Sequence, residues 1–322
     1  MQTCVVKLVT LDDIAAAAQR IAADIVRTPL LPARWADPVR PVWLKPENLQ
    51  PIGAFKIRGA FNALGGLDAA VRAAGVVTYS SGNHAQAVAY AAAAYGVTAH
   101  IVMPEETPAV KVQATRSHGA HVVLCGAGER ESVAAELVES TGGVLVPPFD
   151  HPDVIAGQGT IGLEIAQDLP DVATVLVPIS GGGLASGVGT AIRALCPRAE
   201  IIGVEPELAA DTAESLAAGA LVDWPVAQRN RTIADGLRST PSALTFAHLQ
   251  KVLDDVVTVT EDEIRSAVSE LANRAHLVTE PSGAVALAGY RKVATSPGPA
   301  AVIVSGGNVE PSLLADILSG SQ

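Results

Sequence analysis

The sequence has 322 residues, of which 49% are hydrophobic and 17% charged, so it can form a large buried core in one or two domains. Its net charge of -11 and its aromatic content of 3% argue against a nucleic-acid-binding protein, which needs a basic surface. No stretch of about 18 residues is apolar throughout, and Met1 to Val9 lacks a signal-peptide pattern, so neither a membrane span nor a leader is expected. The three cysteines, Cys4, Cys125 and Cys196, are far apart, which predicts reduced thiols in a cytoplasmic protein.

The first predicted element is an amphipathic helix from Leu11 to Val26, which Thr10 can cap. The segment Arg27-Thr28-Pro29-Leu30 ends this helix. A short strand from Pro41 to Lys45 follows, and it leads into the turn residues Pro46, Pro51 and Gly53.

Lys56 comes directly after that turn, at the first turn of a helix predicted from the apolar spacing of Ile57, Ala60, Phe61 and Leu64. A cation is disfavoured at the positive end of a helix dipole. That setting, together with desolvation, lowers the pKa of an amine and leaves more free amine to attack a carbonyl. A surface lysine whose stem covers apolar side chains is the alternative interpretation.

From Gly75 onward, strands and helices alternate at short spacing, which predicts parallel sheets covered by helices on both faces. The predicted strands are Val76–Tyr79, Thr98–Met103, His121–Cys125, Val144–Val146, Thr174–Pro178, Glu200–Val204, Val256–Val259 and Ala300–Val304. The predicted helices are Asn83–Tyr95, Pro108–His118, Glu129–Ser140, Val154–Asp168, a segment ending at Leu195, Thr212–Ala218, Ser242–Leu249, Glu261–Arg274, Ser282–Val293 and Pro311–Leu318.

Two points along the chain are predicted to be crossings between domains. One is the pair Pro147-Pro148, and the other lies near Leu67 to Ala74. These crossings predict a small α/β domain of residues 71–147 inserted into a large domain of residues 1–70 and 148–322.

The clearest of the informative loops is Ser180-Gly181-Gly182-Gly183-Leu184, between a predicted strand and a predicted helix. Three glycines at a helix N-terminus expose backbone N–H groups that suit a phosphate. The spacing is neither that of a dinucleotide-binding motif nor that of a P-loop. A tight turn of small residues is the alternative.

Two more loops follow predicted strands, and the carboxyl ends of parallel strands are where ligands bind in such sheets. The hydroxyls, amide and N–H groups of Ser80-Ser81-Gly82-Asn83-His84 suit a carboxylate, although an N-cap is the alternative. The hydroxyl of Ser305, in Ser305-Gly306-Gly307-Asn308, could meet a ring nitrogen, and here the alternative is a simple C-terminal turn.

The carboxylates Glu205 and Asp211 follow another strand and could hold a hard divalent cation. A solvated acidic loop is the alternative. His84, His118 and His121 do not have the spacing of a zinc site.

A phosphate-binding loop, a carboxylate-binding turn and an activated lysine together indicate a lysine-bound phosphorylated aldehyde, pyridoxal phosphate, acting on an amino acid. The sequence resembles the serine/threonine dehydratase and serine racemase family of fold type II, tryptophan synthase beta-like, pyridoxal-phosphate enzymes. The matching motifs are ENLQPIGAFKIRGA (47–60), SSGNHAQA (80–87), VIAGQGTIGLEI (154–165), SGGGLASG (180–187), IADGL (233–237), TVTEDEI (258–264), EPSGAVALA (280–288) and SGGNV (305–309).

The resemblance implies a role for each matching residue. Lys56 would bind the cofactor as a Schiff base and act as the base, and the serine matching Ser81 is the second acid/base in the racemase branch. The residues implied to contact the cofactor are Phe55, Lys56, Asn83, Ser180, Gly181, Gly182, Gly183, Leu184 and Ser305. The substrate carboxylate would be received by Ser80, Ser81, Asn83 and His84, and a cation (Mg²⁺ or Ca²⁺) by Glu205, the Ala209 carbonyl and Asp211.

The activity implied is the β-elimination of ammonia from L-threonine or L-serine by a homodimer. Racemisation of serine and dehydration of 3-hydroxyaspartate on the same site are the alternatives, and a colourless amino-acid- or phosphate-binding protein is an alternative of another class. Two positions depart from the family pattern. Ser180 stands where many relatives have a fourth glycine, and Phe149 stands where racemase relatives have asparagine.

Overall fold

The computed structural model describes residues 7–37, 39–293 and 297–320, so Cys4 lies outside the described residues. Two sheets form the fold, and all their strand pairs are parallel except β1 with β2. In spatial order the larger sheet contains β1 (Leu31–Pro32), β2 (Val42–Pro46), β10 (Ala300–Val304), β7 (Thr174–Pro178), β8 (Glu200–Pro206) and β9 (Asp255–Val259). The smaller contains β5 (His121–Cys125), β4 (Ala99–Pro104), β3 (Val76–Tyr79) and β6 (Val144–Leu145). The predicted α/β class with two mostly parallel sheets is confirmed.

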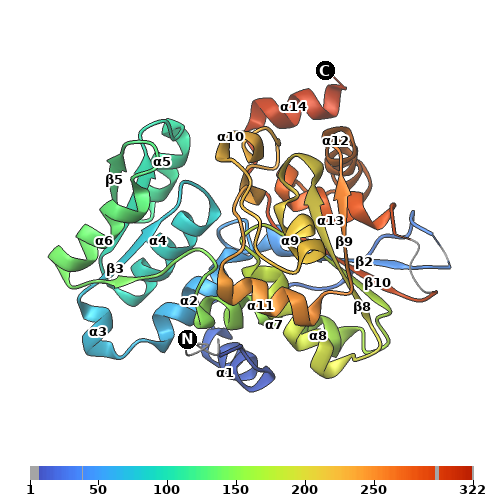
Figure 1. Cartoon of the computed structure of the whole chain (residues 1–322), viewed down its shortest axis with the longest axis horizontal. Helices are drawn as coiled ribbons and strands as arrows, with labels where there is room; N and C mark the ends of the chain where they lie inside the picture. Colours follow the sequence, from blue (N-terminus) through green and yellow to red (C-terminus); the bar gives the residue numbers. More distant parts are fainter. Residues whose placement is uncertain (1–6, 38, 294–296, 321–322) are drawn as a thin grey trace.

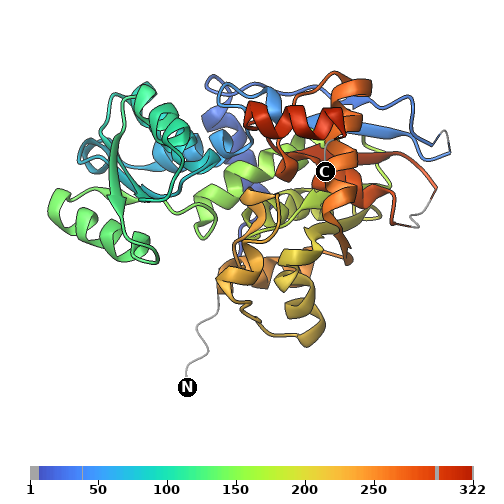
Figure 2. The same cartoon turned by 90° about the horizontal axis from the view of Figure 1, so that it is seen from above.

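The helices surround the two sheets as two lobes (Figures 1 and 2). Those before and around the smaller sheet are α1 (Leu11–Ile21), α2 (Lys56–Gly66), α3 (Ala69–Ala73), α4 (Asn83–Tyr95), α5 (Ala109–Ser117) and α6 (Arg130–Thr141). The later ones are α7 (Pro152–Asp168), α8 (Gly183–Leu195), α9 (Asp211–Ala218), α10 (Val226–Arg229), α11 (Ala243–Val252), α12 (Glu261–Glu270), α13 (Pro281–Tyr290) and α14 (Pro311–Ser319). Short turns are η1 (Glu47–Leu49), η2 (Glu207–Ala209), η3 (Asp235–Leu237) and the π-helical η4 (Leu271–Ala275).

The strands of the larger sheet are apolar on both faces because helices cover both. Along β7, Val175 and Val177 pack in one cluster with α7 and α8, whereas Leu176 packs in another cluster with α12 and α13. This explains the continuous apolar runs in the sequence. The smaller sheet lies wholly within residues 76–145, inside the stretch predicted as an inserted domain, and the boundaries at 71 and 147 stay a prediction. Cys125 and Cys196 are free and buried, as predicted.

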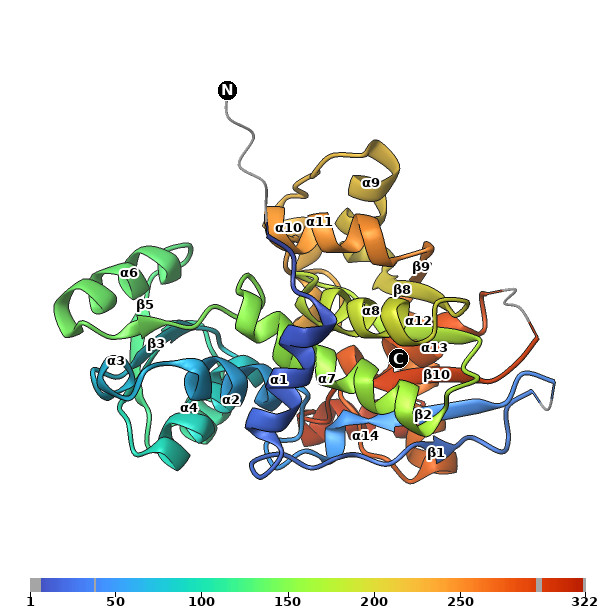
Figure 3. The same cartoon turned by 90° about the horizontal axis from the view of Figure 1, so that it is seen from below.

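Helix α1 is shorter than predicted. It begins with a Thr10–Asp13 capping box but ends at Ile21 rather than Val26. The reason is a polar contact later in the chain: Gln50 accepts the Val26 N–H through Oε1 at 3.0 Å and donates to the Val26 carbonyl at 2.7 Å. These bonds draw the backbone out of the helix. Figure 3 shows α1 lying alongside α7.

Three other differences concern short or distorted elements. The antiparallel strand β1 and the short helix α3 were not predicted, because two and five residues carry too little periodicity. The helix predicted over Glu261–Arg274 changes to a π-helix at Leu271 and ends at His276, whose φ of 57° is left-handed. A widened turn of this kind has no sequence period of its own.

His248 gives the fold a specific response to acid. Its Nε2 accepts the Val9 N–H at 3.1 Å, and burial, with a smaller contribution from Lys251, lowers its pKa to about 4. Between pH 6.5 and 4 the unfolded chain therefore binds more protons at this residue than the folded one, so stability should decrease as pH falls through that range. The measurement is the melting temperature at several pH values for wild type and His248→Gln, with the exposed His121→Gln as control. The slope should flatten only in His248→Gln, and parallel profiles would contradict the assignment.

Candidate active site

Lys56 is the first residue of α2, as predicted. Its Nζ donates to the Pro148 carbonyl at 2.7 Å and lies 5.2 Å from the centre of the Phe55 ring. Burial lowers the pKa of the Lys56 amine to about 8. A considerable fraction of free amine is therefore present near neutral pH, which is what attack on a carbonyl requires.

The glycine loop, Ser180 to Leu184, connects β7 to α8 and is closely packed. Gly182 has φ +85°, and a Cβ on Gly181 would lie 2.3 Å from Cδ1 of Phe149. Ser180 Oγ accepts the Ser239 N–H at 3.1 Å, which holds the first residue of the loop. The N–H groups at the start of α8 lack helical acceptors, and the loop keeps side chains away from them, so it fits a phosphate.

The loop after β10 contacts the turn before Lys56. The Phe55 N–H donates to the Ser305 carbonyl at 3.1 Å, and the Gly307 N–H donates to the Gly53 carbonyl at 2.8 Å. Ser305 is buried, and its hydroxyl donates to the Ser282 carbonyl at 3.3 Å. The parallel pairing of β10 with β2 puts the ends of both strands at one edge of the sheet, as the strand order requires.

Asn83 connects the smaller sheet to this edge of the larger sheet. Its Nδ2 donates to Glu280 Oε1 at 2.6 Å, and its Oδ1 accepts from Asn308 Nδ2 at 2.7 Å. Asn83 follows β3, whereas Asn308 follows β10, so the structure brings together two of the predicted loops.

The remainder of the Ser80–His84 turn is half-buried apart from His84, which is fully enclosed. Ser80 Oγ accepts the Gly82 N–H at 3.3 Å, and Ser81 lies between them. His84 Nε2 lies 2.9 Å from the Val146 carbonyl, and burial and the nearby charge of Lys56 lower the His84 pKa to about 3. His84 is therefore neutral at physiological pH, and its Nδ1 is buried without a hydrogen-bond partner among the described residues.

Two groups at the site did not emerge as site residues from the sequence reasoning. Glu280 is buried, and burial together with Asp235 raises its pKa to about 8, so it carries a proton at neutral pH. The Pro148 carbonyl holds the Lys56 amine. A glutamate immediately before Pro281, at the start of an apolar helix, was the available signal for the first.

The predicted cation site has less support. Both oxygens of Glu205 accept backbone N–H groups at the start of α9, from Thr212 at 3.2 Å and Ala213 at 2.8 Å. Burial raises the pKa of Glu205 to about 8 and raises that of Asp211. Ala209 is in the neighbouring turn η2. Within residues 7–37, 39–293 and 297–320, no group of three or more His, Cys, Asp and Glu side chains is placed to hold a metal ion.

Residues 21–306 match the family model described as "Pyridoxal-phosphate dependent enzyme". The chain belongs to this family. The family explains why a lysine with a lowered pKa lies in the same site as a glycine loop.

Relatives in the family carry several activities in their names. The chain is 46% identical over 283 residues to the L-threonine ammonia-lyase of Geobacter sulfurreducens, covering 86% of this chain and 70% of that one. It is 39% identical over 320 residues to the L-threo-3-hydroxyaspartate ammonia-lyase of Saccharomyces cerevisiae, covering 97% of each. The solved structure of maize serine racemase superposes with a TM-score of 0.92 at 38% identity and covers 98% of both chains. The fold type II architecture is therefore confirmed for this family member.

Proposed function

We propose that this protein is a pyridoxal-phosphate-dependent ammonia-lyase that converts L-threonine, L-serine or both to 2-oxobutanoate or pyruvate and ammonia by β-elimination. The observation that supports this most is the Lys56 amine, with its pKa of about 8, beside loops that suit a phosphate and an amino-acid carboxylate. The 46% identity to a threonine ammonia-lyase favours elimination as the reaction.

The cofactor, when bound, supplies an electron sink for charge that develops at the substrate α-carbon. The proposed cofactor residues are Phe55, Lys56, Asn83, Ser305 and the glycine loop Ser180–Leu184. Lys56 takes the α-proton as general base, because its amine is partly unprotonated and is placed by the Pro148 carbonyl. The half-buried turn Ser80–Asn83 offers hydroxyl, amide and N–H donors to the substrate carboxylate, and neutral His84 forms its inner wall.

The decisive assay uses L- and D-hydroxyamino acids and measures both 2-oxo acid release and chirality. We expect 2-oxo acid and ammonia from L-threonine or L-serine. Ser81→Ala should keep this elimination while losing any D-serine formation, because the hydroxyl of Ser81 is the proposed acid/base on the face opposite Lys56. Wild type that racemises serine faster than it eliminates, or that prefers 3-hydroxyaspartate, would replace the proposal with one of the two alternatives. A protein that binds no cofactor would exclude all three.

A divalent cation at Glu205, Asp211 and the Ala209 carbonyl is a separate part of the proposal. Asp211 Oδ2 is buried and has no hydrogen-bond partner in the described chain, so it could accept a cation. Removal of divalent cations by a chelator should lower the melting temperature, and Ca²⁺ or Mg²⁺ should restore it in wild type but not in Asp211→Asn. An unchanged melting temperature in wild type would identify this region as an ordinary acidic turn.

The proposal also includes a homodimer, which sedimentation of the purified protein tests directly: a single-chain mass would contradict it. Among the described residues, the helices are too short or too polar to cross a membrane.

A further inference from the structure

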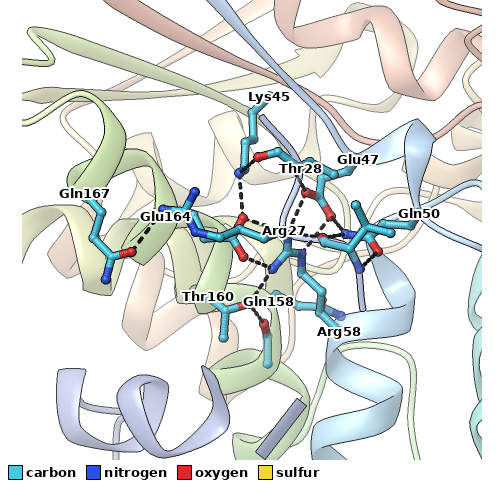
Figure 4. A network of polar contacts seen from close by, with 12 residues as sticks. Arg27, Thr28, Lys45, Glu47, Gln50, Arg58, Gln158, Thr160, Glu164 and Gln167 are labelled. Carbon is cyan, nitrogen blue, oxygen red and sulfur yellow. Dashed lines mark hydrogen bonds and ion pairs between the residues drawn. The ribbon is translucent and has the colours of Figure 1, made fainter. Parts of the chain in front are cut away.

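A network of buried charges begins two residues after Lys56. Its members are Lys45, Glu47, Arg58 and Glu164, which we call the buried charge network (Figure 4). The exposed fraction of the side chain is 0% for Lys45, Glu47 and Arg58, and 9% for Glu164. No loop or ligand contact predicted from the sequence explains these four residues.

Arg58 is the centre of this network. Its Nε and Nη2 each donate to one oxygen of Glu47 at 2.8 Å, and its Nη1 and Nη2 donate to the two oxygens of Glu164 at 2.7 and 2.9 Å. Nη1 also donates to Thr160 Oγ1 at 3.0 Å. The guanidinium therefore uses all its N–H donors in two bidentate contacts, a geometry that a lysine ammonium cannot reproduce.

The charges in the network compensate one another. Lys45 Nζ donates to Glu164 Oε2 and to the Thr28 carbonyl, each at 2.5 Å, so two cations face two carboxylates. A buried ion pair usually stabilises a fold no better than apolar side chains of the same volume. What this network provides is direction, because it joins the Thr28 segment, η1, the first turn of α2 and α7 at fixed angles.

The first turn of α2 needs such fixing. Its N-cap, Phe55, makes no side-chain capping bond, and the turn contains no acidic residue. Apart from Arg58, the side-chain contact that supports this turn from α7 is that of Gln158 Oε1, which accepts the Gly59 N–H at 3.2 Å. Because burial alone lowers the pKa of Lys56, the compensated network does not act on the amine through its charge.

We propose that Arg58 is a positioning residue for Lys56. By holding the first turn of α2 against Glu47 and Glu164, it directs the Lys56 amine toward the cofactor aldehyde. This inference rests on the proposed function, since it presupposes that Lys56 binds the cofactor.

The test is Arg58→Lys, which keeps the charge but not the paired contacts. After loading with pyridoxal phosphate, borohydride reduction and peptide mass analysis give the fraction of bound cofactor that is linked to Lys56. We expect this fraction to fall several-fold, and kcat per bound cofactor to fall by about tenfold to 100-fold with little change in KM. A wild-type linked fraction and wild-type kcat in Arg58→Lys would overturn the proposal, whatever the melting temperature.

Two further variants separate positioning from stability. Ile264→Ala removes a buried side chain on α12 outside the network, so it should lower the melting temperature and keep the linked fraction of wild type. Thr160→Val removes one contact of Arg58 and no charge, and it serves if Arg58→Lys does not fold. It should lower the linked fraction less than Arg58→Lys, and an unchanged fraction would overturn the proposal. Wild type without any linkage at Lys56 would instead refute the proposed function.

Discussion

Replacing Lys56 by alanine should abolish both turnover and the covalent link to the cofactor. The substitution removes the amine that is held at the Pro148 carbonyl and whose pKa burial lowers to about 8. Loss of a general base alone lowers a rate by about 10²- to 10⁴-fold, and here the cofactor-binding group disappears as well. We therefore expect kcat to fall by at least about 10³-fold. Pyridoxal phosphate should still bind through the glycine loop, but borohydride should no longer fix it to the protein.

The matched control is Lys251→Ala, which removes an exposed lysine from the last turn of α11. Its turnover and visible absorbance should equal those of wild type. A Lys56→Ala protein that turned over threonine or serine normally would show that another residue performs the chemistry, and the assignment of the site would then be wrong.

The second large effect is expected from Gly181→Ala, which should weaken cofactor binding without unfolding the protein. The new Cβ would lie 2.3 Å from Phe149 Cδ1, so either the ring or the loop must move. Overpacking of this kind costs about 1–3 kcal/mol. If the loop moves, its N–H groups lose their alignment, and the dissociation constant of pyridoxal phosphate rises by about tenfold to 100-fold.

Two further variants decide which movement occurs. Gly181→Ala combined with Phe149→Ala relieves the contact and should recover most of the affinity. Gly219→Ala places a side chain at a left-handed glycine with open space around it, so it imposes backbone strain far from the loop and should leave affinity unchanged. The measurement is titration of the apo-protein with pyridoxal phosphate. Equal affinities for wild type and Gly181→Ala would show that this loop does not hold the cofactor.

Most regular elements could be predicted because their signals are local. The bounds predicted for β3, α4 and β10 agree with the structure, since each is a short apolar or alanine-rich run between turn residues. The end of α1 could not be predicted, because Gln50, which draws Val26 out of the helix, is 24 residues away. Such a contact depends on the folded chain and leaves no mark in the period of the helix.

The same distinction applies to the site. Lys56 and the glycine loop were identifiable because turn chemistry and function occupy the same few residues. Arg58 and Glu164 are 106 residues apart and look like ordinary helix charges in the sequence. Glu280 likewise becomes significant only when folding brings it to Asn83. Charge pairs between distant segments therefore require the structure.

The strand order of the larger sheet determines when the site can first exist during synthesis. Strand β10 inserts between β2 and β7, so the sheet joins the two ends of the chain. The smaller sheet, by contrast, is complete once residue 145 has left the ribosome. Until β10 emerges, β2 and β7 each have one open, apolar edge, which in a parallel sheet is prone to wrong association. The nascent protein must therefore keep Lys56 and its surroundings unassembled until nearly the last residues are made.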